Sequence, residues 1–420
     1  SEYKIVKNGA VIDPSGLKKY DVVTLDAANR QALVSDTRVS GRYSEGGPTV
    51  SYPQEVKVYG NSFRISDSAA AFFKDMKLKD YITLLFDADG NVAAAYPRST
   101  VSADMQGIVT AIDESRATVT LTNGITLQNM DIDKLDKPTA LMGRLVSVST
   151  NGDKAVLVKR SLSGKTSGEW SLSDGKLGTK SVSSRVNVYE EVLSGAPLSR
   201  IALSDISLAK VPSSDIRYTV TDSAGTITTV ILGDVTGDSW LYGMGYGEKI
   251  KNDSYFDEPD DDIVNNKKWS LYSDEEKKKY RDEHTSYSYI ESVVLRHWSD
   301  GKEIKDKFKV LSLPSGLSGG PIAVPKGYST DESIVNTSLD IKKLKLIDTV
   351  DRTAFDGASG VRTKDGYYAL ADQLGIYDTE NRDFIATLQS AKSNYTKFAL
   401  YANDTAEDGG KIRIITVSNK

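Results

Sequence analysis

One stretch of the chain, residues 78–97 (LKDYITLLFDADGNVAAAYP), constrains the fold more than any other. Apolar residues fill both alternating registers of its first half, which predicts a strand that is buried on both faces. The run 87–91 predicts a tight turn, because Gly90 can adopt a positive φ and the Asp side chains can bond their own backbone. Residues 92–96 then return as a second strand. The stretch therefore predicts a β-hairpin.

Hairpins of this plan recur along the chain. Each consists of a strand, a turn rich in Asp, Asn and Gly, and a second strand, while long helical periodicity is almost absent. The clearest examples lie at 17–34, 78–97, 141–158, 216–232 and 398–417. Their irregular spacing indicates tandem modules rather than a solenoid or a propeller. We therefore predict an all-β fold of tandem small β-barrel or β-sandwich modules built from hairpins.

Composition suggests where these modules end. Residues 161–180 are rich in Ser, Gly and Lys and carry few apolar side chains, which is typical of a linker or an exposed loop. We expect β-modules at 1–100, 101–165, 181–345 and 346–420, with residues 166–180 as the linker or exposed loop. Because strands flank an insertion at 249–286, the last module can alternatively form one discontinuous unit with residues 181–248.

The insertion at 249–286 differs from the rest of the chain, because half of its residues are charged. Ser273 and Glu276 have the spacing of a capping box, and the DEEKKKYRDE run between 274 and 283 predicts one short polar helix. Insertions of this kind carry function more often than the scaffold that bears them. We predict that this one makes the contact with a partner. Its candidate surface consists of Tyr255, Phe256, Trp269, Tyr272 and Tyr280.

A cluster of acids in the insertion suggests a metal site. Five carboxylates fall within six residues, and calcium prefers six to eight oxygen ligands. The cluster comprises Asp257, Glu258, Asp260, Asp261 and Asp262. It lacks the spacing of an EF-hand, so a solvated acidic loop is the alternative. Residues 233–238 resemble the start of a dockerin calcium loop, but the strand-like residues that follow favour a turn between two strands.

Catalytic patterns are weak. The absence of cysteine excludes disulfides, thiol catalysis and cysteine-ligated zinc. Residues 316–322 (GLSGGPI) resemble the motif around the nucleophile of trypsin-like serine proteases, but His297 and His284 lie only 21 and 34 residues before Ser318. A Gly-rich loop is the better interpretation. We expect no enzymatic activity; a hydrolase would need Ser318 within reach of a histidine, or a pocket that holds two facing carboxylates.

Charge and composition narrow the class of protein. The net charge of −5 argues against binding to a nucleic-acid backbone. No run of about 18 apolar residues occurs, so we expect no transmembrane segment. A chain of 420 residues without cysteine fits the exported proteins of Gram-positive bacteria better than a cytosolic enzyme. We therefore expect an extracellular location, at the cell surface or in the cell wall.

The hairpins also suggest a family. LKDYITLLFDADGNVAAAYP, MQGIVTAIDESRATVTLTNGITL and VILGDVTGDSWLYGMGYG resemble the β-rich repeats beside S-layer-homology domains in surface proteins of Firmicutes. The resemblance covers about three quarters of the chain and omits 249–286 and 314–345; the helical anchor motif itself is absent. It implies a structural or adhesion region that contacts other surface proteins or assembles with itself. A module that binds cell-wall polysaccharide or another glycan is the alternative.

Overall fold

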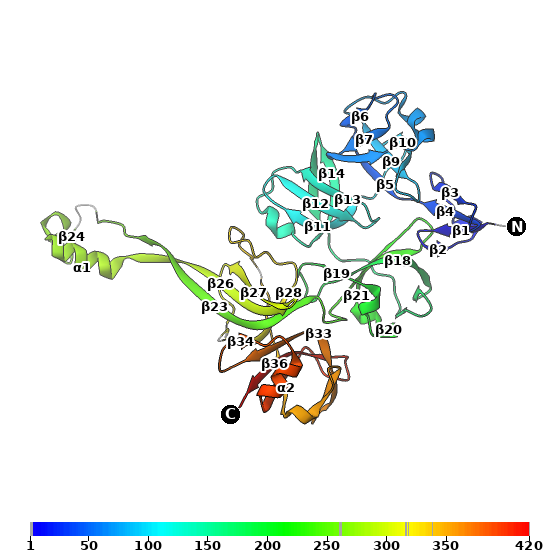
Figure 1. Cartoon of the computed structure of the whole chain (residues 1–420). Helices are drawn as coiled ribbons and strands as arrows, with labels where there is room; N and C mark the ends of the chain where they lie inside the picture. Colours follow the sequence, from blue (N-terminus) through cyan, green and yellow to red (C-terminus); the bar gives the residue numbers. More distant parts are fainter. Residues whose placement is uncertain (1–2, 260–262, 316, 318, 338, 420) are drawn as a thin grey trace. The chain divides into compact units, whose positions relative to one another are not determined.

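The computed structural model describes residues 3–259, 263–315, 317, 319–337 and 339–419 (Figure 1). Strands dominate, so the predicted all-β class is confirmed. Among the described residues, α-helix is confined to α1 (Asp274–His284) and α2 (Leu388–Asn394). The chain divides into two compact units, which we call unit 1 and unit 2. Unit 1 comprises Ser1–Leu241 with Pro325–Tyr328, and unit 2 comprises Tyr242–Val324 with Ser329–Lys420.

Short helical turns connect many of the strands. They are 3-10 helices at Pro14–Gly16, Asp67–Phe73, Pro138–Leu141, Leu203–Asp205, Ser213–Asp215, Trp269–Leu271 and Arg352–Ala354. Within the described parts of the chain, none of the helices has both the length and the apolar character needed to cross a membrane.

Unit 1 begins with a four-stranded sheet in the order β2-β1-β4-β3. Its strands are β1 (Lys4–Lys7), β2 (Ala10–Val11), β3 (Val22–Asp26) and β4 (Gln31–Ser35). Asn8 and Gly9 both have positive φ, and they reverse the chain between β1 and β2. The hairpin of β3 and β4 then places β4 parallel to β1. Turn residues therefore explain both hairpins, whereas the parallel contact joins strands that are distant in sequence.

The hairpin predicted at 78–97 is confirmed. It consists of β9 (Tyr81–Phe86) and β10 (Val92–Pro97), with Gly90 at φ 83° in the turn. Every residue from Ile82 to Phe86 is buried, as the two apolar registers predict. β5 (Arg38–Arg42) extends this sheet in the order β10-β9-β5. A separate three-stranded sheet contains β6 (Glu45–Gly47), β7 (Glu55–Val58) and β8 (Asn61–Arg64).

A five-stranded sheet follows in the order β13-β12-β11-β14-β15. Its strands are β11 (Gln106–Ile112), β12 (Arg116–Leu121), β13 (Thr126–Asp131), β14 (Leu145–Asn151) and β15 (Lys154–Lys159). One cluster of buried side chains runs from Val39 to Leu157 and includes residues of this sheet and of the two three-stranded sheets. The expected module boundary near residue 100 therefore lies within a shared hydrophobic core.

The last sheet of unit 1 has seven strands. They are β16 (Trp170–Ser171), β17 (Lys176–Leu177), β18 (Lys180–Glu190), β19 (Ser199–Ile201), β20 (Lys210–Val211), β21 (Ile216–Thr221) and β22 (Ile227–Leu232). Here the structure differs from the linker or exposed loop expected at 166–180. β16 and β17 lie in that stretch, and Trp170 and Leu177 belong to the core of the sheet. Two large apolar side chains suffice to bury a segment that is otherwise polar.

Unit 2 contains two main sheets. The first has the order β27-β26-β23-β28-β29, and β24 pairs with β25 in a small separate hairpin. These strands are β23 (Trp240–Tyr255), β24 (Ile263–Val264), β25 (Lys267–Lys268), β26 (Ser286–Ser299), β27 (Lys302–Val310), β28 (Gly320–Pro325) and β29 (Lys342–Lys343). The second sheet consists of β30 (Lys345–Val350), β31 (Phe355–Asp356), β32 (Gly360–Thr363), β33 (Gly366–Asp378), β34 (Asp383–Phe384), β35 (Lys397–Ala402) and β36 (Lys411–Ser418).

One strand arrangement occurs three times. A first strand is followed by a short antiparallel partner, and a later hairpin places its second strand parallel to the first. The parallel pairs are β1 with β4, β18 with β22 and β33 with β36. In the second and third copies even the irregularity agrees, because the register shifts between Val182 and Asn187 and between Leu370 and Gly375.

The last residue of the first parallel strand is buried and charged in each copy. These residues are Lys7, Glu190 and Asp378, which pair with Val34, Leu232 and Val417, respectively. A buried charge requires a partner or several hydrogen bonds. The end of this strand is therefore the point at which each copy is tied to the chain that follows.

Candidate functional site

The outer part of the hairpin of β23 and β26 forms a two-stranded ribbon, which Figure 1 shows between the sheet and α1. We call residues 249–255 and 286–290 the arm, and residues 256–285 the tip. The strands remain paired as far as Tyr255 and Ser286, whereas β27 pairs with β26 only as far as Glu291. All residues from 249 to 255 are exposed. The arm is therefore open to solvent along its length.

Side chains across the arm bind one another. On one face the ammonium group of Lys251 lies 3.3 Å from the ring centroid of Tyr287, and that of Lys249 lies 4.5 Å from the ring centroid of Tyr289. Lys249 also forms an ion pair of 2.8 Å with Glu291. Ile250 lies opposite Ile290 in the register. Cross-strand pairs of these kinds stabilise a ribbon that has no sheet behind it.

The tip has a small aromatic core. The ring of Trp269 lies 5.2 Å from Tyr272, 5.3 Å from Tyr280 and 6.4 Å from Phe256, and Trp269 is only 5% exposed. The structure thus brings together four of the five aromatic residues that the sequence predicts as a contact surface. The fifth, Tyr255, lies on the arm and is 67% exposed.

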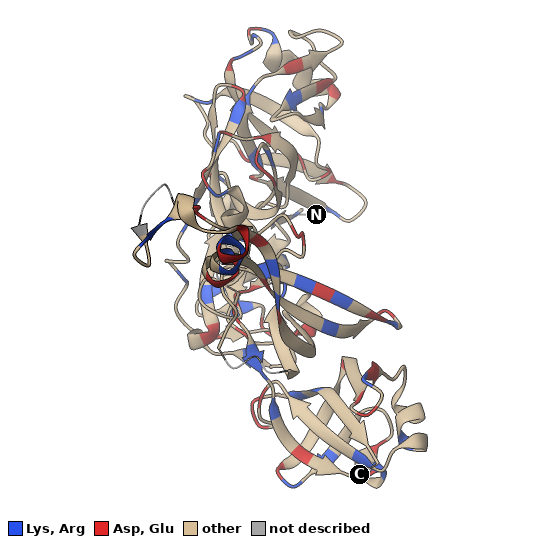
Figure 2. Cartoon of the chain, turned by 90° about the vertical axis from the view of Figure 1, so that its left-hand side faces the viewer, with Lys and Arg blue, Asp and Glu red and all other residues tan. Residues whose placement is uncertain are grey.

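The polar helix of the tip is confirmed as α1, and its capping box is present. The hydroxyl of Ser273 accepts a hydrogen bond from the Glu276 N–H, and the Glu276 carboxylate accepts one of 2.8 Å from the Ser273 N–H. Lys267 donates a further bond to Glu276, and these bonds lower the pKa of Glu276 to about 2. The colouring of the ribbon in Figure 2 shows acidic and basic residues together along this helix.

Only two of the five residues of the predicted calcium cluster lie among the described residues. Asp260, Asp261 and Asp262 lie outside the described residues. Asp257 is exposed, while Glu258 accepts hydrogen bonds of 3.1 Å from the indole of Trp269 and from Arg281. In the described ranges, no group of three or more His, Cys, Asp or Glu side chains could hold a metal ion. The calcium site therefore stays a prediction.

The loop that resembles the start of a dockerin forms a turn, as the sequence favours. It connects β22 and β23, and the backbone N–H groups of Val235 and Thr236 donate to the carboxylate of Glu190, at 3.0 and 2.7 Å. The hydroxyl of Ser239 donates to the other carboxylate oxygen. Burial raises the pKa of Glu190, although these hydrogen bonds oppose the shift. Glu190 thus holds the loop against β18.

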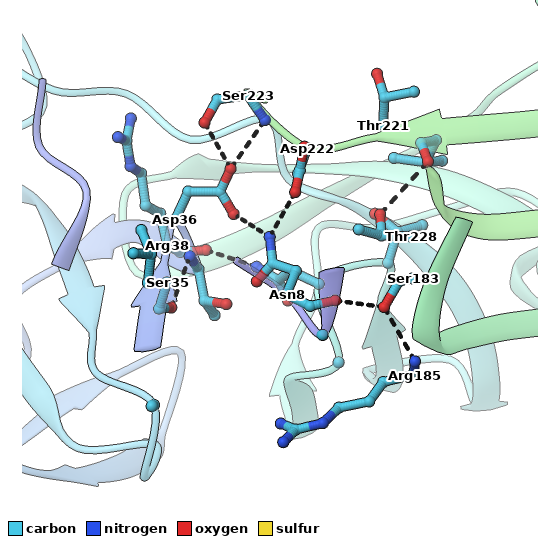
Figure 3. A pocket seen from close by; sticks show the side chains of 18 of the residues that line it. Asn8, Ser35, Asp36, Arg38, Ser183, Arg185, Thr221, Asp222, Ser223 and Thr228 are labelled. Atoms are coloured by element: carbon cyan, nitrogen blue, oxygen red, sulfur yellow. Dashed lines mark hydrogen bonds between the residues drawn. The ribbon is translucent and has the colours of Figure 1, made fainter. Parts of the chain in front are cut away.

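Unit 1 also has a polar cavity of about 680 Å³ that the sequence did not indicate (Figure 3). Asn8 is one of the residues that line it. The amide nitrogen of Asn8 donates to Asp36, at 2.8 Å, and to Asp222, at 3.1 Å. The carbonyl of Asn8 accepts a hydrogen bond from the hydroxyl of Ser183. The end of β1 is therefore bonded to β18 and to the turn between β21 and β22.

Two of the carboxylates that line the cavity, those of Asp36 and Asp222, accept hydrogen bonds from donors of the chain itself. The N–H and hydroxyl of Ser223 donate to Asp36, at 2.9 and 2.8 Å, and the N–H groups of Ala224 and Thr226 donate to Asp222. Burial raises the pKa of Asp222. It also acts to raise that of Asp36, but the hydrogen bonds outweigh burial and lower the pKa of Asp36. This arrangement favours holding the sheets together over proton transfer.

The buried ammonium group of Lys7 strengthens the same junction. It forms an ion pair with Asp21, and it donates a hydrogen bond of 2.6 Å to the hydroxyl of Ser223. We call Lys7, Asn8, Asp36, Asp222 and Ser223 the junction cluster. Turn chemistry identifies Asn8, but no signal in the sequence indicates that its partner Asp222 is 214 residues away.

The histidines take part in local contacts. His297 is buried, and its Nε2 lies 3.0 Å from Asp306 on the neighbouring strand. The ring of His284 stacks on Tyr280 with the centroids 3.8 Å apart. Ser318 lies outside the described residues, so the resemblance to a protease motif remains untested.

Comparisons with known proteins do not extend these observations. No protein-family profile matches the chain, and no curated protein sequence matches it. The resemblance to repeats beside S-layer-homology domains therefore stays a prediction.

Proposed function

We propose that this chain is an extracellular structural or adhesion region of a bacterial cell-surface protein, and that the arm and the tip make its contact with a partner. The observation that supports this proposal is the folded tip at the end of an exposed ribbon. An isolated two-stranded hairpin is only marginally stable in water, and ordering each residue costs conformational entropy. A contact with a partner would offset that cost.

The side chains on the surface of the arm favour another protein, or a second copy of the chain, as the partner. The arm presents aromatic and apolar side chains beside charges of both signs, which is common in protein interfaces. The exposed examples are Ile250, Tyr255, Tyr287 and Tyr289 on the arm, and Leu271 lies exposed on the tip.

Removing the tip tests the proposal directly. Because Tyr255 pairs with Ser286, a two-residue Asn-Gly turn can replace residues 256–285 without changing the register of the arm. We expect the parent chain to assemble in light-scattering experiments or to be retained by isolated cell walls, and the shortened chain to do neither. Equal assembly and retention of both chains would contradict the proposal. An unchanged melting temperature of the remaining sheets is the folding control.

A carbohydrate-binding module is the second candidate, and the polar cavity of unit 1 supports it. Planar polar side chains that match sugar hydroxyls line this cavity, among them Gln106, Asn123, Arg185 and Asn187. A glycan array is the test. Binding that is lost in Arg185→Ala and kept in the chain without its tip would favour this second function.

A further inference from the structure

A second hollow in unit 1, of about 470 Å³, lies beside β10 and the 3-10 helix Asp67–Phe73. Three aromatic rings line it, those of Phe72, Tyr81 and Tyr96. Phe72 and Tyr81 are 41% and 43% exposed, so both rings are accessible to a ligand. The hollow is distinct from the arm and from the polar cavity.

The aromatic wall is held in place before any ligand arrives. Tyr96 contacts Tyr20 edge-to-face on one side, at 5.0 Å between centroids, and Phe72 on the other, at 5.5 Å. Tyr81 projects from β9, the strand that pairs with β10. Rings that are fixed in this way lose little conformational entropy when a ligand binds.

Two carboxylates complete the lining. Asp75 and Asp80 are exposed, and neither forms an ion pair with another described residue. The carboxylate of Asp80 accepts a hydrogen bond of 2.8 Å from the backbone N–H of Lys77. The lysines of this stretch do not line the hollow, so its charged groups are all acidic.

We propose that this hollow binds a primary alkylammonium group, as on the lysine side chain of a partner peptide. Aromatic faces attract a cation through the ring quadrupole. The carboxylates attract its charge and accept hydrogen bonds from its N–H groups, which a quaternary ammonium lacks. Met76 and Pro97 offer apolar surface for the methylene stem. The site goes beyond the proposed contact of the arm and does not depend on it.

Saturation-transfer NMR on the whole chain tests the site with defined probes. Nα-acetyl-lysine methylamide is compared with its neutral analogue, Nα-acetyl-norleucine methylamide, and with choline. We expect the lysine probe to bind at least about tenfold more tightly than norleucine, since only its ammonium group gains from the rings and the carboxylates. Binding of choline as tight as that of lysine would contradict the requirement for N–H donors.

Two variants and a matched control keep the outcome clear. The double variant Asp75→Asn/Asp80→Asn removes the negative charge at nearly constant shape, and Phe72→Ala removes an exposed ring. All three positions are exposed, so we expect both variants to keep the hydrophobic core. Each should weaken lysine binding by about fivefold or more. Asp89→Asn removes an exposed acid of the same module outside the hollow, and it should leave binding unchanged. Undetectable lysine binding, or equal binding of all variants, overturns the proposal, whatever the tip-deletion experiment shows.

Discussion

Glu190 and Asp378 occupy the same position in two copies of one strand arrangement, each as the last residue of the first parallel strand. Both carboxylates are buried, and both accept hydrogen bonds from the chain that follows the strand. Burial raises the pKa of Glu190. For Asp378 burial acts in the same direction, but hydrogen bonds from Tyr395 and Asn381 outweigh it and lower the pKa. The contributions of these two equivalent carboxyl groups to stability therefore change with pH in opposite directions.

Replacing Glu190 should separate the roles of its hydrogen bonds and its charge. We expect the free energy of unfolding of Glu190→Gln to lie within about 1 kcal/mol of the parent value. The glutamine amide can donate to the two hydroxyls that donate to the carboxylate in the parent. Glu190→Leu should destabilise by about 3 kcal/mol or more, since buried backbone and hydroxyl donors lose their acceptor. Urea unfolding followed by tryptophan fluorescence measures both. Equal stability of the leucine variant and the parent would contradict this role.

The raised pKa of Glu190 predicts a pH dependence of stability with a definite sign. The folded state binds the proton more tightly than the unfolded state, whose value is near 4.5. The stabilisation from this group is therefore complete below pH 4.5 and is lost as the pH rises through the folded pKa. The stability of the parent relative to Glu190→Gln should fall over that range. For Asp378→Asn the difference should run the other way, with the parent losing stability as the pH falls below 3.8.

Asn8 should control the attachment of the first sheet. Its amide nitrogen separates two carboxylates, and its backbone has a φ of 47°, so glycine is the replacement that removes the amide without backbone strain. We expect Asn8→Gly to speed amide hydrogen exchange in β1 to β4, and Asn8→Asp to speed it further by placing a third carboxylate in the cluster. Exchange in β11 to β15 provides the internal reference. Unchanged exchange in β1 to β4 of both variants would contradict the role of Asn8 in the junction cluster.

Trp269 should hold the tip together independently of the sheets. Trp269→Ala removes the centre of the aromatic core and should cost about 3 kcal/mol or more of local stability. Leu271→Ala is the matched control, because Leu271 lies two residues away and is 67% exposed. Its effect should stay within about 0.5 kcal/mol. Hydrogen exchange in α1 reports the loss, and equal protection in the two variants would contradict a folded tip core.

Protonation of Glu276 should loosen the start of α1. Because the folded pKa of about 2 lies below the ordinary value of 4.5, the stabilisation is present above pH 4.5 and is lost as the pH falls toward 2. Glu276→Gln should remove this dependence while keeping the shape of the capping box. Hydrogen exchange of α1 at pH 5 and pH 3 measures it. A helix equally protected at both values in the parent would refute the assignment.

Local chemistry determined the parts of the fold that depend on neighbours in sequence. The turn at Gly90 and the two apolar registers of 81–86 determine the hairpin of β9 and β10, and Ser273 with Glu276 determines the start of α1. These signals act over a few residues, so they could be recognised without the structure. The same reasoning failed at Trp170, because a polar stretch with one buried aromatic side chain has the composition of a linker.

Only the tertiary structure decided which of these elements meet. The sequence by itself determined the hairpins, the all-β class and the polar helix of the insertion. The parallel pairs, the buried charges at Glu190 and Asp378, and the bond from Asn8 to Asp222 across 214 residues depend on how the sheets pack. A carboxylate in a turn looks the same in sequence whether it faces water or a distant donor. Its environment, and with it its role, is set by packing between segments that have no local relation.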